Sequence, residues 1–180
     1  MKVLGIDPGS LQTGYGIIDE NNRVHGFGAV AFSGDHIVRV QAIYHEITRL
    51  VKELKPDTCG IEMPVYGRNP PAMLKLGRAQ AAAMLAVLNQ GVSVAQYTPK
   101  MVKRSVTGNG NASKQQVTYM VSSLLEFGEL NHELTHDASD ALAVAFCHKE
   151  REVTGKESGE SHYNNWAAFV RANPDRVIGN

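Results

Sequence analysis

Cysteine is scarce in this sequence, with only two residues in 180, and both lie in apolar surroundings. Cys59 and Cys147 therefore predict buried, reduced thiols of a cytosolic protein, and they argue against a disulfide framework or a zinc site. Long apolar runs are also missing, so the sequence predicts no transmembrane helix, and the N-terminus lacks the pattern of a signal peptide. The length and an apolar content of 43% indicate one soluble globular domain.

Acidic residues are absent from a long internal stretch. No Asp or Glu occurs between Met63 and Leu125, whereas the same stretch contains seven Lys or Arg residues. Because the whole chain has a net charge of zero, this segment carries +7 and the remainder carries −7. Chance clustering on a solvated surface is the alternative, but a segregated positive segment is typical of a protein that binds a polyanion. The seven cations are Arg68, Lys75, Arg78, Lys100, Lys103, Arg104 and Lys114.

The N-terminal stretch presents a carboxylate at the end of an apolar strand. Residues 2–7 predict a short buried strand that ends on Asp7, and residues 14–18 predict a strand that returns after a turn. A charge in this position is costly to desolvate unless it has a partner. Two readings remain open at this point: Asp7 caps the Pro8-Gly9 turn, or it is a metal ligand.

A second strand also ends on a carboxylate. Residues 23–32 predict a third strand of an antiparallel meander, and apolar residues spaced by three or four predict an amphipathic helix over 37–54. The strand predicted over 58–63 follows that helix, so it is expected to run parallel to the first strand. Asp7 and Glu62 would then lie side by side at one end of the sheet, where two carboxylates share a proton or a cation.

The second half of the chain predicts one further strand and four helices. The helix over 72–90 is rich in Ala and Met and has an unusually wide apolar surface, which is typical of a buried helix or of a subunit interface. A strand over 92–97 and a helix over 99–106, capped by Thr98, come next. The glycine-rich loop over 108–111 is either a connector or a phosphate-contacting loop, and Ser113 caps a helix over 114–127.

The last predicted helix, over 135–148, begins with two more acids. Asp137 and Asp140 are spaced i, i+3 and therefore share one face. The favourable helix dipole explains Asp137 better than it explains Asp140, which adjoins an apolar run and needs a partner cation. His136 is a minor candidate for contact with a reacting water, whereas His148 is expected to be a helix residue and not a ligand. Residues 151–180 form a polar tail that is expected to be loose, with a short segment that docks.

Several separate motifs occur in a consistent order along the chain. The chain resembles the RuvC family of Holliday-junction resolvases, in the ribonuclease-H-like superfamily, over roughly residues 1–150. The motifs that carry the resemblance are Leu4-Gly5-Ile6-Asp7-Pro8-Gly9-Ser10 with Thr13-Gly14-Tyr15-Gly16, Ile61-Glu62, Leu74-Lys75-Leu76-Gly77-Arg78-Ala79, Val102-Lys103, Lys114-Gln115-Gln116-Val117 and Asp137-Ala138-Ser139-Asp140-Ala141-Leu142-Ala143.

The resemblance implies an α/β, ribonuclease-H-like domain over 1–150, with a five-stranded mixed sheet, antiparallel then parallel, flanked by helices. It implies a cytoplasmic, nucleoid-associated homodimer that nicks two opposed strands of a four-way DNA junction with Mg²⁺, for which Mn²⁺ would substitute. It also implies partners of the RuvA and RuvB type, and two metal ions per subunit. The implied catalytic metal ligands are Asp7, Glu62, Asp137 and Asp140.

The implied DNA contacts come from the acid-free segment. Lys103 and Lys114 match family lysines that contact DNA near the scissile phosphate. A family aromatic that stacks on an unpaired base aligns with Val65, and Tyr66 beside it is a substitute. The full set of expected DNA-binding residues is Tyr66, Arg68, Lys75, Arg78, Lys103, Arg104 and Lys114.

Three alternative functions stay open on the sequence alone. The first is a related ribonuclease-H-like nuclease that acts on another branched DNA or on an RNA–DNA substrate. The second is an ATP-binding protein of the actin or sugar-kinase type, whose first hairpin also carries an acidic Gly-Ser turn. The third is a non-catalytic junction-binding protein, which four intact carboxylates argue against.

Overall fold

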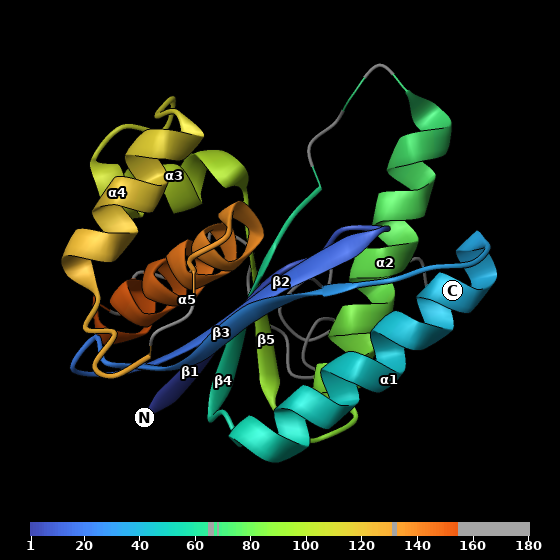
Figure 1. Cartoon of the computed structure of the whole chain (residues 1–180), viewed down its shortest axis with the longest axis horizontal. Helices are drawn as coiled ribbons and strands as arrows, with labels where there is room; N and C mark the ends of the chain where they lie inside the picture. The colour runs from blue at the N-terminus through green and yellow to red at the C-terminus, as the bar shows by residue number, and fades with distance from the viewer. Residues whose placement is uncertain (65–66, 68, 131–132, 155–180) are drawn as a thin grey trace, which may run out of the picture.

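The computed structural model describes residues 1–64, 67, 69–130 and 133–154. Its centre is a five-stranded sheet with the strand order β3-β2-β1-β4-β5, so the N-terminal strand β1 lies in the middle (Figure 1). The strands are β1 (Lys2–Asp7), β2 (Gln12–Asp19), β3 (Val24–Ala31), β4 (Thr58–Glu62) and β5 (Ser93–Tyr97). The ribonuclease-H-like fold class predicted from the sequence is confirmed.

The pairing of the strands follows the predicted arrangement. β1 pairs with β2, and β2 with β3, in an antiparallel meander. β4 lies parallel to β1, with Ile6 opposite Ile61, and β5 lies parallel to β4. The carboxyl ends of β1, β4 and β5 therefore meet at one end of the sheet.

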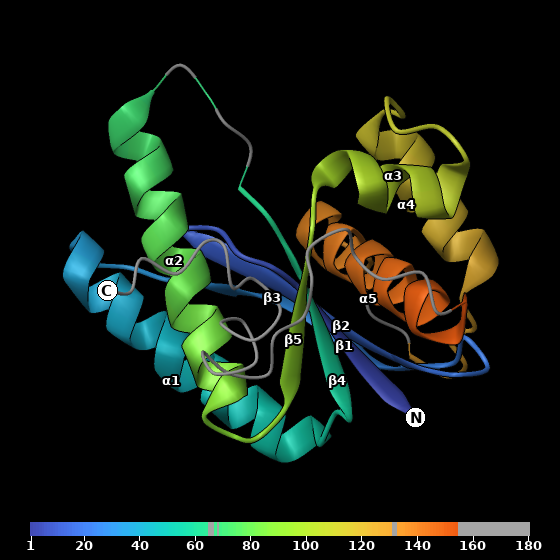
Figure 2. The ribbon, with the colours of Figure 1, turned by 180° about the vertical axis from the view of Figure 1, so that it is seen from behind.

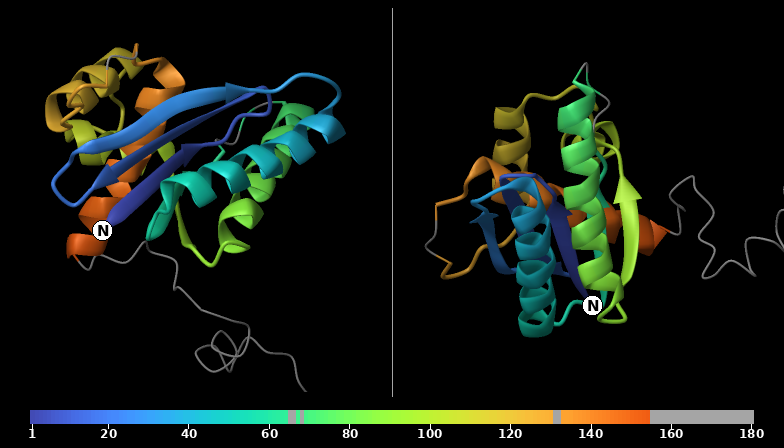
Figure 3. Two further views of the ribbon diagram at one scale, coloured as in Figure 1. Left: turned by 60° about the horizontal axis from the view of Figure 1, so that its bottom comes forward. Right: turned by 90° about the vertical axis from the view of Figure 1, so that its right-hand side faces the viewer.

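Helices cover both faces of the sheet and make a three-layer α/β/α arrangement (Figures 2 and 3). One face carries α1 (His36–Leu54) and α2 (Pro70–Leu88), and the other carries α5 (His136–Thr154) with α3 (Pro99–Thr107) and α4 (Lys114–Leu124) packed on it. Each face has its own hydrophobic cluster, and the alternate side chains of β1 supply both, with Val3 on the α5 side and Leu4 on the α1 side. The sheet thereby separates two cores, as expected for mixed α/β layers.

Glycines in the strands allow α5 to lie unusually close to the sheet. A Cβ atom at Gly5 would stand 2.1 Å from the carbonyl oxygen of Ala141, and one at Gly14 would stand 2.1 Å from that of Asp137. Any side chain at these positions would push α5 away from the sheet. Because Gly14 pairs with Asp7, this close approach also sets the distance between the first turn of α5 and Asp7.

Three helices differ from the sequence prediction at their ends. α2 begins at Pro70 and ends at Leu88, two residues earlier than predicted at both ends, and Asn89 is its C-cap. α4 ends at Leu124 and not near Phe127, because Glu126 donates its N–H to Asn22 and accepts from the N–H of Val24. α5 continues six residues beyond His148, since Lys149 is buried and its ammonium binds Asn22.

The two cysteines are free and buried, as predicted. Within the part of the chain that the structure describes, no helix is long and apolar enough to cross a membrane. The predicted docking of the tail falls on residues 155–180, which lie outside the described residues, so the division into a domain over 1–150 and a tail over 151–180 stays a prediction.

Candidate active site

Two acidic side chains occupy the ends of the two central strands. Asp7 is the last residue of β1 and Glu62 the last residue of β4, and the pairing of Ile6 with Ile61 places the two acids next to each other. Their carboxyl groups are in hydrogen-bonding contact with each other. The predicted side-by-side arrangement of these two acids is confirmed.

The first turns of α5 bring two more acids to the same end of the sheet. The charges of Asp140 and Asp137 both act on Asp7, and that of Asp140 also acts on Glu62. Gln12, from the start of β2, donates its amide hydrogen to Asp137 Oδ2 at 2.6 Å. Lys114, the first residue of α4, donates to Asp140 Oδ2 at 3.1 Å. Acids from three distant parts of the sequence therefore meet at this end of the sheet.

Burial and like charge raise the pKa of both strand-end acids. The pKa of Asp7 is raised to about 6, first by burial and then by the charge of Asp140. The pKa of Glu62 is raised to about 8, again by burial first and then by Asp7. Lys114 acts in the opposite direction, but its side chain is 63% exposed and its attraction is screened by solvent. The site therefore holds more negative charge than its own cations neutralise.

The donor set fits a hard divalent cation. All four groups offer carboxylate oxygens, which Mg²⁺ prefers, and a cation among them would relieve the repulsion that raises the two pKa values. In the residues described by the structure, no three Asp, Glu, His or Cys side chains already stand in a finished metal-binding arrangement. Gln12 and Lys114 each contact one oxygen, Oδ2, of Asp137 and Asp140, and the second oxygen of each carboxylate can still bind an ion.

The cations predicted to bind DNA fall into separate groups. Lys114 reaches the acids, and Lys103 lines a cavity that begins at Met63, the residue after Glu62. Arg104 lies on another side of α3, in a smaller hollow that it shares with Arg151. Tyr66 and Arg68 lie outside the described residues.

Lys75 and Arg78 form a group on α2, on the opposite face of the sheet from Lys114. Burial lowers the pKa of His36, and the charges of Arg78, Arg39 and Lys75 lower it further, so these cations gather at the first turn of α1. The basic segment of the sequence is therefore not one continuous surface around the acids.

The two histidines considered from the sequence differ in their surroundings. His148 is only 1% exposed, and its ring nitrogens form hydrogen bonds of 2.7 Å with Thr58 Oγ1 and with the hydroxyl of Tyr97. It is therefore part of the core and is not a ligand, as predicted. His136 is exposed at the start of α5.

Sequence reasoning missed the role of Gln12 as the partner of Asp137. Its position in the turn after β1 gave no signal, because a polar residue in a turn is commonplace. The contact depends on the close approach of α5 to Gly14, which becomes visible only when the helix is placed on the sheet.

A mixed sheet of this order, with acids on its two central strand ends and on a crossing helix, defines a nuclease of the ribonuclease-H-like class. The sequence profile of the family described as "Crossover junction endodeoxyribonuclease RuvC" matches residues 3–148. The chain is 50% identical to the protein of that name from Salinibacter ruber, over 98% of this chain and 99% of the relative. The chain therefore belongs to the RuvC family.

Further comparisons agree with this assignment. The chain is 42% identical to the crossover junction endodeoxyribonuclease RuvC of Chlorobium phaeovibrioides, over 99% of this chain and 100% of the relative. Among solved structures, RuvC of Thermus thermophilus in complex with a Holliday junction substrate is 28% identical, with a TM-score of 0.74 over 86% of this chain and 96% of that one. The structure of T. thermophilus RuvC itself has the same TM-score and 29% identity.

Proposed function

We propose that this chain is a DNA endonuclease that resolves four-way Holliday junctions by paired symmetric nicks, in homologous recombination and DNA repair. The observation that carries the proposal is the convergence of Asp7, Glu62, Asp137 and Asp140 at one sheet end, beside Lys114. The T. thermophilus relative bound to a junction substrate supports the choice of DNA substrate. Family membership favours this function over the ATP-binding alternative.

The four acids would hold two Mg²⁺ ions, for which Mn²⁺ would substitute. When bound, such ions neutralise a phosphodiester, lower the pKa of a water molecule and stabilise the leaving oxygen. Asp7 is next to Glu62 and is also acted on by the charges of Asp140 and Asp137, so it would hold an ion together with either set of acids. Because burial, first of all, raises the pKa of Glu62 to about 8, an ion would compete with a proton for this carboxylate.

Lys114 and Lys103 would hold the phosphate backbone of the cleaved strand. Lys114 is mostly exposed and pairs with Asp140, so its ammonium can turn from that carboxylate to a phosphate oxygen. Lys103 lies beside the end of β4. Arg104 on another side of α3, and Lys75 and Arg78 on α2, would contact more distant parts of the junction, together with Tyr66 and Arg68.

The enzyme would act as a homodimer, because two symmetric cuts require two sites related by a two-fold axis. Helix α2 supports this state. Its buried side packs Ala79, Ala83 and Val87 into the protein, while Leu74, Leu85 and Leu88 are exposed on other sides of the same helix. A junction-binding and branch-migration complex of the RuvA and RuvB type would deliver the substrate, in the cytoplasm at the nucleoid.

The proposal is tested by cleavage of three labelled substrates in Mg²⁺: a four-way junction, the matching duplex and an RNA–DNA hybrid. We expect paired cuts in the junction alone. Asp7→Asn should abolish cleavage while junction binding remains, because the affinity comes from the cations and not from the acids. Cleavage of the hybrid in preference to the junction would instead favour the related nuclease named above.

A further inference from the structure

A cavity of about 440 Å³ opens next to the acids, between the end of β4 and the first turns of α3. Met63, which directly follows Glu62, forms part of its wall, and its N–H donates to the carbonyl of Tyr97 at 2.8 Å. This bond extends the pairing of β4 with β5 by one residue and thereby holds the backbone of Met63 in the cavity wall. Lys103 also lines the cavity, so a phosphate that binds its ammonium would lie beside this cavity.

The chemistry of the cavity fits a nucleotide better than a free phosphate. Met63, Pro64 and Pro99 supply apolar surface, while Lys100 and Lys103 supply positive charge. Apolar walls suit the flat face of a base, and ammonium groups beside them suit the charge of the linked phosphate. The volume lies in the usual range of small-molecule sites, which is about 300–1,000 Å³.

The loop over 108–111 holds a polar side chain at the edge of this cavity. Asn111 lines the cavity, and its side-chain amide is exposed without a hydrogen-bond partner among the described residues. The loop itself is fixed, because the Thr107 hydroxyl accepts the N–H of Asn109 and lies within hydrogen-bond distance of the carbonyls of Lys103 and Asn109. The Asn109 side chain in turn accepts the N–H of Asn111 at 3.0 Å.

Glycine at position 110 is also required for this arrangement. A Cβ atom there would stand 2.6 Å from Cγ of Lys100 and 3.0 Å from its carbonyl oxygen. The loop therefore packs directly on the first turn of α3, and Asn111 is presented by a supported backbone. An amide offers one acceptor and two donors, which can match the edge of a base.

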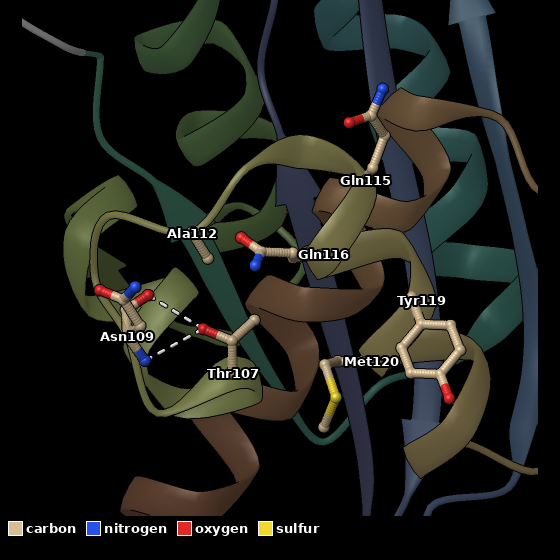
Figure 4. A pocket seen from close by; sticks show the side chains of 7 residues that line it. All are labelled: Thr107, Asn109, Ala112, Gln115, Gln116, Tyr119 and Met120. Atoms are coloured by element: carbon tan, nitrogen blue, oxygen red, sulfur yellow. Dashed lines mark hydrogen bonds between the residues drawn. The ribbon is translucent and has the colours of Figure 1, made fainter.

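The two other hollows near α3 lack this combination. The groove between the end of α3 and α4, of about 430 Å³, contains Thr107, Gln115 and Tyr119 but no charged side chain (Figure 4). The hollow of about 270 Å³ beside Arg104 and Arg151 is strongly basic but does not contain Met63 or Pro64. Of these three hollows among the described residues, the first joins apolar walls, cations and an exposed amide beside a candidate catalytic acid.

We propose that this cavity receives one unpaired base of the cleaved strand, next to the scissile phosphate, and that Asn111 recognises its edge. The cavity would thereby set the sequence preference of cleavage. A base leaves the stack most easily where pairing is already interrupted, as at the exchange point of a junction. The inference rests on the proposed function, since it needs a junction strand at the acids.

The test compares cleavage rates on a set of junctions that differ only in the base pairs flanking the exchange point. Single-turnover rates in excess enzyme give the ratio between the best and the worst base at each position. For Asn111→Ala we expect this ratio to fall about tenfold at one position, which is the size of one lost base contact. Asn21→Ala removes the same amide from the β2–β3 turn, at the opposite end of the sheet, and should leave every ratio unchanged.

A second measurement reports on the base itself without cleavage. Junctions carrying 2-aminopurine at single positions are mixed with the protein in the absence of divalent metal, and fluorescence rises where the base leaves the stack. We expect a rise at the position that Asn111→Ala identifies. Unchanged ratios in Asn111→Ala, a wild type without any base preference, or no fluorescence rise at any position would overturn the cavity's role. Failure of the wild type to cut any junction would instead overturn the proposed function.

Discussion

Asp7 and Glu62 bind their protons more tightly in the folded protein than in the unfolded chain, because burial and like charge oppose ionisation. A carboxyl group with a raised pKa stabilises the fold at low pH, and this stability is lost as the pH rises from the unfolded value towards the folded one. The acids needed for chemistry therefore reduce stability at the pH where the enzyme works.

Glu62→Gln tests this effect. In EDTA we expect the Tm of the wild type to fall relative to that of the variant as the pH rises from about 4.5 to about 8, because the variant has no group to ionise at position 62. At pH 8 the variant should melt at least about 3 °C higher. Thermal unfolding of both proteins across this range, with and without Mg²⁺, measures the difference.

Magnesium provides the internal control for this comparison. Added Mg²⁺ should raise the Tm of the wild type at pH 8 and raise that of Glu62→Gln less, because a metal that binds only the folded state stabilises it. Tm curves that run parallel at all pH values would show that the pKa of Glu62 is not raised by folding.

Lys114 pairs with Asp140 in this structure and is also expected to contact DNA. If its ammonium moves to a phosphate, Lys114→Ala should weaken junction binding and reduce the slope of log K against log salt by about 0.9. The measurement is a salt titration of junction affinity by fluorescence anisotropy without metal, which avoids cleavage.

Lys52→Ala is the matched control for Lys114→Ala. Lys52 is an exposed lysine in the last turn of α1, just before β4 begins and therefore at the opposite sheet end from Glu62. Its removal should leave the salt slope unchanged. If the salt slope also stays the same in Lys114→Ala, Lys114 does not contact a DNA phosphate and its partner is Asp140 alone.

Among the elements, α5 depends most on small residues in its neighbours. Gly5→Ala would place a Cβ atom against the backbone of Ala141 and Ala145, which cannot rotate away. We expect a loss of about 3 kcal/mol in the free energy of unfolding, at the upper end of the range for overpacked cores. Chemical denaturation measures this loss.

Gly77→Ala supplies the contrast for Gly5→Ala. Gly77 lies in α2, and a Cβ atom there would meet nothing within 4 Å. The variant should be as stable as the wild type or more stable by up to about 1 kcal/mol, because alanine favours a helix. Equal effects of the two substitutions would show that α5 can shift without cost.

The elements most accurately predicted from the sequence are those defined by regular patterns. Strand β4 followed a helix, so its parallel pairing with β1 and the meeting of Asp7 with Glu62 followed from connection rules. Thr98 and Ser113 were also correctly predicted as N-caps, since their side chains accept from the N–H groups of Met101 and Gln116.

Features made by contacts between distant segments could not be predicted in this way. The length of α5 depends on the burial of Lys149, whose polar side chain made the region look loose. The loop over 108–111 looked flexible because of its glycines, yet Thr107 and Asn109 fix it. Sequence patterns register the type of residue but not its partner across the fold.

At the scale of the whole molecule, α2 carries apolar side chains on more than one side. Leu74, Ala81, Leu85 and Leu88 are exposed and recur at intervals close to multiples of 3.5 residues. Such a stripe is typical of a seam between two helices. Paired nicks need two active sites, so the same stripe offers the two-fold contact that the proposed reaction requires.

Leu85→Glu should therefore separate the dimer, because it places a charge in the middle of this stripe, where Leu85 is 54% exposed in the single chain. Sedimentation velocity should show the wild type at twice the mass of one 19.6 kDa chain and the variant at that mass. Tyr119→Glu makes the same change at a side chain that is 72% exposed on α4, and it should remain dimeric. On a junction, the separated variant should nick the two strands independently, so that singly nicked product accumulates, whereas the control should cut both strands together. A wild type that sediments as a single chain, with or without junction, would contradict both the seam and the paired mechanism.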